Sequence, residues 1–258
     1  MTQVLKLSVC LLVTACCSER FSIAFAASTS TIAISDAFVA TGPTGNLSDN
    51  NYGGGGALAL AAPGLPNGEF QSVIKFGFSG VRNSFDAQFG AGGWSVQSVS
   101  LQLSSSPHSN PVYNDIAPGL FGVSLMQNNS WIEGTGNASN PAADGISYSS
   151  LQSTFINNAA DRALGTFSFP GGTSGLNSYA LDLSPDLTTD ILGGSDVSLR
   201  LFAADNSVSY LFSSRAQASG QPQLVITAVP EPGTVALLSL AFGLFLWRVR
   251  RSLPIANR

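Results

Sequence analysis

Cysteine, histidine and charged residues are scarce in this chain of 258 residues. The three cysteines, Cys10, Cys16 and Cys17, all lie near the N-terminus, and the single histidine is His108. The rest of the chain therefore has no disulfide, no thiol nucleophile and no thiolate metal site. The same shortage excludes soft metal sites built from Cys and His. The core must be stabilised by packing alone.

Charged residues make up only 10% of the chain, whereas glycine occurs 27 times. This composition disfavours a helical cytosolic enzyme and favours a turn-rich β protein. Residues 27–228 contain five basic and 13 acidic side chains, a net charge of −8. Because such a domain repels nucleic acid and anionic lipid, we expect no nucleic-acid partner. The charge suits cation binding or neutral partners, or simply keeps a β-rich protein soluble.

The first 26 residues have the features of a secretory signal peptide. Lys6 supplies a positive n-region, Leu7 to Cys17 forms an apolar h-region, and Ala24 and Ala26 make an A-x-A cleavage site. We therefore expect the secretion machinery and a signal peptidase to act on residues 1–26. The alternative is a lipobox at residues 13–16, with Cys16 carrying a lipid.

Residues 27–228 show the alternation of polar and apolar side chains that is typical of short β-strands. Clusters of Gly, Pro, Asn, Asp and Ser separate the strands at a spacing typical of a sandwich. We expect nine or ten strands in a single antiparallel β-sandwich. The predicted strands are residues 31–40, 57–62, 69–80, 94–106, 119–127, 163–172, 176–184, 196–205, 207–214 and 222–229.

The alternation is clearest in residues 69–80. Phe70, Ile74 and Phe76 fall on one face of an extended chain, whereas Val73 and Lys75 fall on the other. This pattern predicts a strand with one buried and one exposed face.

Two segments are candidates for short helices. Ser184 has the character of an N-cap, Pro185 suits the first helical position and Asp186 suits the first turn, which predicts a helix over residues 184–192. Residues 147–163 show a weaker helical pattern. Neither helix is long enough to change the fold class.

A series of short motifs runs through residues 35–227. In order, the stretches are SDAFV (35–39), NNYGGGGALAL (50–60), SVIKFGFSGV (72–81), VQSVSLQL (96–103), WIEGTG (131–136) and LFSSRAQASGQPQLVIT (211–227). This series resembles the DNRLRE-type domains found on microbial surface proteins. The resemblance implies a jelly-roll sandwich akin to carbohydrate-binding modules, and it implies no catalytic residue.

The C-terminal residues 229–252 have three parts. Pro230, Glu231 and Pro232 form a Pro-Glu-Pro motif, residues 235–247 are apolar, and a basic cluster follows at Arg248, Arg250 and Arg251. Together these parts resemble a PEP-CTERM sorting signal. The resemblance implies export in a Gram-negative bacterium that makes exopolysaccharide. It also implies cleavage near the motif by a membrane transpeptidase of the exosortase type.

The physical character of this tail fits such a signal. The two prolines should keep the approach to the membrane extended and free of strand pairing. The apolar run is short for a bilayer core of roughly 30 Å, but snorkelling of Arg248 would bring it near the limit. The arginines favour a cytoplasmic C-terminus, with residues 253–258 as a short cytoplasmic tail. The alternative is a plain single-pass membrane anchor.

Little in the sequence indicates catalysis. A Ser-His-Asp arrangement would have to use His108, which lies in a polar loop without a Gly-x-Ser-x-Gly motif. A glycosidase needs two positioned carboxylates, and the spacing pairs none of the candidates. These candidates are Glu69, Glu133, Asp144 and Asp205.

The composition allows a structural calcium ion, because calcium needs only oxygen ligands. Asp36 and Asp205 would lie near each other if the first and last strands meet. Asp49 lies in a second oxygen-rich loop. The alternative is that these residues simply form turns.

Carbohydrate binding would use an aromatic side chain whose face packs on a sugar ring. The candidate contacts are Tyr52, Tyr113 and Trp131, with Trp94 as a further exposed candidate. A structural role for Trp131 is the alternative.

The sequence thus predicts an exported, non-enzymatic protein of the cell surface or extracellular matrix. We expect transient anchoring in the inner membrane through the C-terminal helix and a structural or exopolysaccharide-associating role. The alternative function is a surface-anchored polysaccharide lyase or glycosidase.

Overall fold

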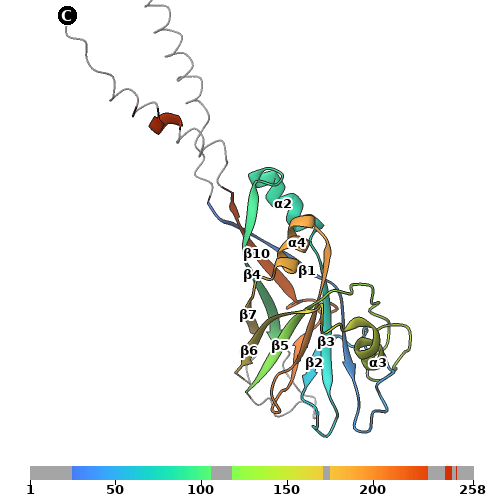
Figure 1. Cartoon of the computed structure of the whole chain (residues 1–258). Coiled ribbons are helices and arrows are strands. Elements are labelled where there is room, and N and C mark those ends of the chain that lie inside the picture. Colours follow the sequence, from blue (N-terminus) through green and yellow to red (C-terminus); the bar gives the residue numbers. More distant parts are fainter. Residues whose placement is uncertain (1–24, 106–117, 171–174, 232–241, 246–247, 249–258) are drawn as a thin grey trace, which may run out of the picture.

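Ten antiparallel strands dominate the part of the chain that the structure describes (Figure 1). The computed structural model describes residues 25–105, 118–170, 175–231, 242–245 and 248. Every predicted strand segment overlaps one observed strand, so the mostly β prediction is confirmed. The strands are β1 (Ala27–Ala40), β2 (Ala57–Ala61), β3 (Phe70–Gly77), β4 (Trp94–Ser105), β5 (Gly119–Met126), β6 (Arg162–Phe169), β7 (Gly175–Leu181), β8 (Asp196–Ala203), β9 (Ser209–Ser213) and β10 (Gln223–Pro230).

Strand β1 closes the sheet upon itself. Its first half, from Ala27 to Ile32, pairs with β10, and its second half, from Ala33 to Ala40, pairs with β3. A register shift at Ala33 and Ser35 lets the strand turn from one partner to the other. The closed path runs β1-β10-β4-β9-β2-β3, with β8, β5 and β6 extending from β3 and β7 pairing with β4.

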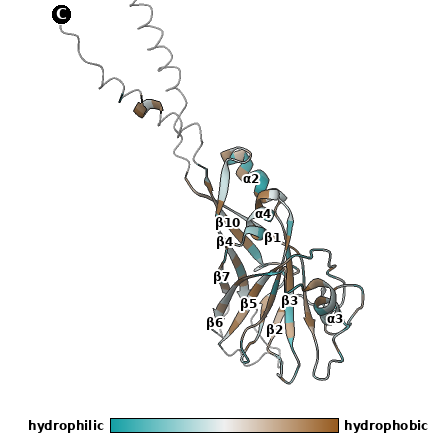
Figure 2. Cartoon of the chain, in the orientation of Figure 1, coloured by the Kyte–Doolittle hydropathy of each residue, from teal (hydrophilic) through white to brown (hydrophobic). Residues whose placement is uncertain are grey.

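The main core fills the interior of this closed sheet. Along β4, Val99, Leu101 and Leu103 are at most 1% exposed, whereas Ser98 on the same strand is exposed. This is the alternation expected for a strand with one buried face, and Figure 2 shows hydrophobic and hydrophilic residues along the strands. Val96 is only partly buried and lies next to a register shift between β4 and β10.

The prediction that one face of β3 is exposed is wrong, because both faces of this strand are covered. Val73, on the outer face, is 0% exposed and belongs to a second apolar cluster. This cluster is completed by residues that lie far away in the sequence, including Met126, Trp131, Ile146 and Leu151. Residues 127–157 lie over this face, so the strand pattern alone could not reveal the covering.

Short helices cover parts of the sheet. The predicted helix is confirmed as α4 (Pro185–Gly193), in which the Ser184 side chain accepts a hydrogen bond from the Leu187 N–H. The weaker helical pattern corresponds to α3 (Tyr148–Ser150) and a π-helix (Leu151–Phe155).

Helix α2 (Ser79–Phe89) was not predicted. Its sequence contains glycine, serine and asparagine, and its N-terminus has no side-chain cap. Val81 and Phe85 bury its inner face in the main core, with the ring centroid of Phe85 4.9 Å from that of Trp94. Tertiary packing therefore overrides weak intrinsic helix propensity here.

The two ends of the β domain lie side by side. Ala27, which follows the predicted signal-cleavage residue Ala26, pairs with Ala228. Both ends leave the sheet near α2 (Figure 1). The other predicted cleavage residue, Ala24, lies outside the described residues.

The predicted strand-free approach to the membrane is wrong for Pro230. Pro230 is the last residue of β10 and pairs with Trp94, and the Glu231 N–H donates to the Gly93 carbonyl over 2.9 Å. Proline is tolerated here because β1 has already ended, which leaves this side of β10 without a partner in the part of the chain that the structure describes.

Most of the predicted membrane span, residues 235–247, lies outside the described residues, as do Pro232, Arg250 and Arg251. Residues 242–245 are helical and exposed, and Arg248 is also exposed. Within the described ranges, no helix has the length and apolar character needed to cross a membrane.

The packing of α2 gives a first prediction. Phe85→Ala should lower the free energy of unfolding by about 3–5 kcal/mol, because it leaves a cavity beside Trp94. Urea denaturation measures this change. Phe89→Ala, at a partly buried position of the same helix, is the control and should cost clearly less. Equal costs for the two variants would contradict the packing described for α2.

Candidate functional site

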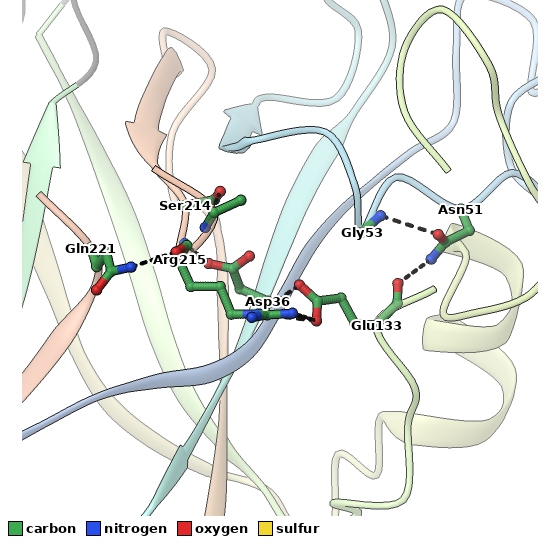
Figure 3. A network of polar contacts seen from close by, with 8 residues as sticks. Asp36, Asn51, Gly53, Glu133, Ser214, Arg215 and Gln221 are labelled. Atoms are coloured by element: carbon green, nitrogen blue, oxygen red, sulfur yellow. Dashed lines mark hydrogen bonds and ion pairs between the residues drawn. The ribbon is translucent and has the colours of Figure 1, made fainter. Parts of the chain in front are cut away.

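A buried carboxylate marks the junction of four chain segments at one side of the sheet (Figure 3). Asp36, on β1, is only 1% exposed. Its Oδ2 accepts a hydrogen bond from the backbone N–H of Arg215 over 2.6 Å. Strand β1 is thereby tied to the segment that follows β9.

Arg215 also binds Glu133 through its side chain. The Arg215 Nε lies 2.9 Å from Oε1 and 3.0 Å from Oε2 of Glu133, and Nη2 forms a salt bridge with the same carboxylate. A bidentate arginine–carboxylate pair fixes geometry as well as charge. It connects residues 131–147 to the same junction.

Asn51 connects a third segment, which follows β1, to residues 133–146. It uses all of its side-chain hydrogen-bonding capacity to do so. Its Nδ2 donates to the carbonyls of Glu133 and Ile146, and its Oδ1 accepts from the backbone N–H groups of Gly53 and Gly136. A side chain that is 0% exposed must be satisfied in this way, because an unpaired buried amide is costly.

Glycines allow this close approach. A Cβ at Gly136 would lie 2.0 Å from the Asn51 carbonyl oxygen, and one at Gly134 would lie 2.3 Å from Oδ1 of Asn51. Gly134 also has a φ of +77°, which favours glycine. The position of Asn51 thus requires the two glycines of the EGTG sequence at residues 133–136.

Four of the stretches that carry the family resemblance meet at this junction. SDAFV contributes Asp36, NNYGG contributes Asn51, WIEGTG contributes Glu133 and the SSRA sequence contributes Arg215. Motifs separated by up to 179 positions along the chain therefore form one polar network. Its contacts tie loops to the sheet, and its central carboxylate is closed to solvent.

The pKa of Asp36 is strongly raised at this junction. Burial raises the pKa of this carboxyl to about 7; the Arg215 backbone hydrogen bond opposes the rise, and nearby Glu133 adds to it. A raised pKa in a cleft indicates catalysis, but Asp36 is too buried to touch a substrate. We therefore assign it a structural role.

The predicted carbohydrate contacts at Tyr52 and Trp131 are wrong, because both rings are buried. Tyr52 is 4% exposed and stacks on Phe38 with centroids 4.7 Å apart. Trp131 is 2% exposed, and its Nε1–H donates to the Ser198 hydroxyl while Lys75 lies over its ring. Neither ring can present a face to a sugar.

Trp94 is also buried, at 2% exposure. Tyr113 lies outside the described residues, so its role stays a prediction.

The predicted calcium ligands are not brought together. Asp36 faces Arg215, whereas Asp205 accepts hydrogen bonds from the backbone N–H groups of Leu120 and Ser207. Asp49 is exposed in its loop. In the part of the chain that the structure describes, no three His, Cys, Asp or Glu side chains are arranged to hold a metal ion.

The acidic side chains considered for catalysis each have a local partner. Tyr148 donates to Glu69, Arg215 binds Glu133, and the Thr135 backbone and hydroxyl both donate to Asp144. Asp205 caps a turn. His108 lies outside the described residues, so the structure does not place it.

A second polar cluster lies on the outer face of β8 and was missed by the sequence reasoning. The Arg200 Nε–H donates to Gln71 Oε1 over 2.7 Å, Gln71 donates to Glu69, and the Tyr148 hydroxyl donates to the same carboxylate. This relay fixes the orientation of the guanidinium group.

Phe202 lies next to that guanidinium group. The Cζ atom of Arg200 is 4.6 Å from the ring centroid of Phe202, and the ring extends over Gly122 of β5, where a Cβ would lie 2.5 Å from the ring. Phe202 is partly exposed, and the neighbouring Leu120 is 41% exposed. We call Arg200, Phe202 and Leu120 the β8 surface.

Arg200 differs from the other described arginines of the domain. Arg82, Arg162 and Arg215 each form a salt bridge, whereas Arg200 forms none within the described residues. Burial lowers its pKa, and the charges of Glu69, Tyr148 and Asp161 partly offset this. The alternation of Ser198, Arg200 and Phe202 could have indicated an aromatic ring beside a cation.

The C-terminal end of the domain carries a further candidate functional feature. Residues 228–251 match the PEP-CTERM protein-sorting motif. The chain carries this sorting motif. It indicates an exported protein that an exosortase recognises, and the match begins within β10. No curated protein matches the chain.

The raised pKa of Asp36 gives a second prediction. A carboxyl whose folded-state pKa exceeds its unfolded value stabilises the fold most at low pH, and this stabilisation is lost as the pH rises toward about 7. Asp36→Asn keeps an acceptor for the Arg215 N–H but cannot ionise. The free energy of unfolding of this variant, relative to that of the unaltered protein, should therefore rise by about 2–4 kcal/mol between pH 4 and pH 7.

Thermal and urea unfolding across pH 4–8 test this expectation. Asp49→Asn, a matched change at an exposed position, should leave the pH dependence unchanged. A difference between Asp36→Asn and the unaltered protein that stays constant across this range would contradict the burial of an ionisable Asp36.

Proposed function

We propose that this protein is a non-enzymatic component of the cell surface or extracellular matrix, with a structural or carbohydrate-associating role. The sorting motif at residues 228–251 is the observation that supports this destination. We further propose that the apolar run anchors the precursor in the inner membrane until an exosortase cuts it.

The β domain is proposed to be a jelly-roll sandwich of the DNRLRE type. The closed antiparallel sheet is compatible with that fold. Four of the stretches that carry the family resemblance meet at the Asp36 junction. This supports the proposal further, because residues that stabilise one junction together are expected to occur together in the sequence.

The β8 surface is the best candidate for contact with a polysaccharide. Sugar rings pack on aromatic faces, and their hydroxyl groups bind arginine and carboxylate side chains. Phe202 is held over Gly122, and Arg200 keeps its terminal nitrogens free of any described salt bridge. Tyr148 and Glu69 hold the arginine in place through Gln71, so its orientation is set before a ligand arrives.

The involvement of each candidate carboxylate in a local structural contact supports a binding role over an enzymatic one. Glu133 is neutralised by Arg215, and Asp205 accepts backbone hydrogen bonds. A reducing-end release assay on the host exopolysaccharide tests this choice, and we expect no release. Release that depends on any of these carboxylates would favour the glycosidase or lyase alternative.

A glycan array that includes the host exopolysaccharide gives the third prediction. Phe202→Ala should weaken binding about tenfold, because it removes the aromatic face. Leu176→Ala truncates another exposed apolar side chain, on β7, and should have no effect. Binding that survives Phe202→Ala would exclude the β8 surface, and no binding to any glycan would leave only the structural role.

The sorting reaction gives the fourth prediction. Intact-mass measurement of the surface protein should show loss of the residues beyond the PEP motif. Glu231→Ala should accumulate full-length precursor in the membrane fraction, because it removes the only charged residue of the Pro-Glu-Pro sequence at residues 230–232. A surface protein that still ends at Arg258 would leave the plain membrane anchor as the correct interpretation.

A further inference from the structure

The sorting motif begins inside the folded sheet. Pro230 forms the last rung of β10 with Trp94, and the next residue, Glu231, donates its N–H to the Gly93 carbonyl. Thus no free linker separates the domain from the motif that the sorting enzyme must read.

The rest of the structure holds this last rung in place. Trp94 is 2% exposed, packs against Phe85 and donates its Nε1–H to Asp86 Oδ1 over 2.8 Å. The acceptor residue, Gly93, belongs to a turn closed by its own N–H bonded to the Gly90 carbonyl, and a Cβ at Gly93 would lie 2.6 Å from the Phe89 carbonyl oxygen. Both partners of the motif are therefore fixed on the β4 side.

On its other side the motif has no strand partner among the described residues. The β1–β10 ladder ends at Ala27 and Ala228, so within these residues Val229 and Pro230 have a strand neighbour only on β4. The Glu231 N–H points to β4, and backbone groups alternate along a strand, so the amide position of Pro230 faces the open side. Proline has no N–H to offer there, and among the described residues the end of β10 is held from one side only.

The sequence allows little distance between this fixed end and the membrane. Only Pro232, Gly233 and Thr234 lie between Glu231 and the start of the apolar run at Val235. Three extended residues span at most about 10 Å. An enzyme that works at the membrane surface must therefore reach a motif whose first residues are paired through their backbone with β4 and Gly93.

We propose that the folded domain controls access to its own sorting motif, and that residues 229–231 must leave β4 before the exosortase cuts the chain. Opening is local, because Ala228 and the residues before it are paired on both sides and stay in place. Proteolysis of a locally closed segment follows the population of its open form. Gly93 and Trp94 are in this view positioning residues for the sorting reaction.

This proposal rests on the sorting reaction that the motif match indicates. A disulfide across the last rungs tests it, in the full-length chain expressed in the exporting host. Ser95→Cys with Val229→Cys joins two directly paired residues that are both half-buried. Paired positions on neighbouring strands lie within the Cα separation that a disulfide needs.

The control is Ser98→Cys with Thr227→Cys. This second pair joins the same two strands on the other side of the register shift and leaves residues 228–231 able to open. No native cysteine lies beyond residue 17, so no competing disulfide is expected in the exported domain. Thiol labelling verifies that each bond has formed, and precursor and product are quantified by intact mass.

We expect the first disulfide to slow processing at least about tenfold relative to the control disulfide, because the closed rung cannot open. Adding a reductant to the cells should restore the normal rate. Equal processing of the two disulfide variants would overturn the proposal, since the enzyme would then accept the closed end. Equal arrest of both variants would also overturn it, because the block would not be specific to the end of β10. Failure of the sorting reaction itself is distinguishable, since the unaltered chain would then remain unprocessed.

Discussion

Strand β1 is the constraint on which the rest of this structure depends. Its two halves pair with β10 and β3, which are not otherwise neighbours, so the sheet closes only because this strand changes partner at a register shift. Closure protects strand edges from pairing with other chains. It also places three features on one strand: the domain boundary at Ala27, the shift at Ala33, and the buried carboxylate of Asp36.

The junction around Asp36 takes the place that a disulfide holds in many exported domains. Loops contributed by distant segments cost entropy to order, and this domain has no cysteine with which to join them. Asn51, Glu133 and Arg215 instead hold the loops through a fully used amide and a bidentate ion pair. Burying Asp36 has a cost, visible in its raised pKa, and that cost is smallest when the carboxyl is protonated.

The sequence predicted the elements of the fold better than it predicted the site. Strand positions followed from local alternation, and α4 followed from its cap at Ser184, because both signals lie within a few residues. The burial of Tyr52 and Trp131 could not be predicted, because the groups that cover them come from elsewhere in the chain. Helix α2 was missed for the same reason, since its stability comes from the core against which Phe85 packs.

At the β8 surface too, contacts from distant residues could not be predicted from the local sequence. Phe202 and Arg200 alternate on one strand, which a sequence can show, but the relay that orients Arg200 draws on Gln71, Glu69 and Tyr148. At the C-terminus, composition places the end of the domain before Pro230, whereas pairing places it after Glu231. A cut at any bond beyond Val229 would leave every β1–β10 pair in place, because that ladder ends at Ala228. The sheet can therefore lose its sorting tail without losing its closure, and the one-sided rungs at the end of β10 are the part of the sheet that processing can disturb at least cost.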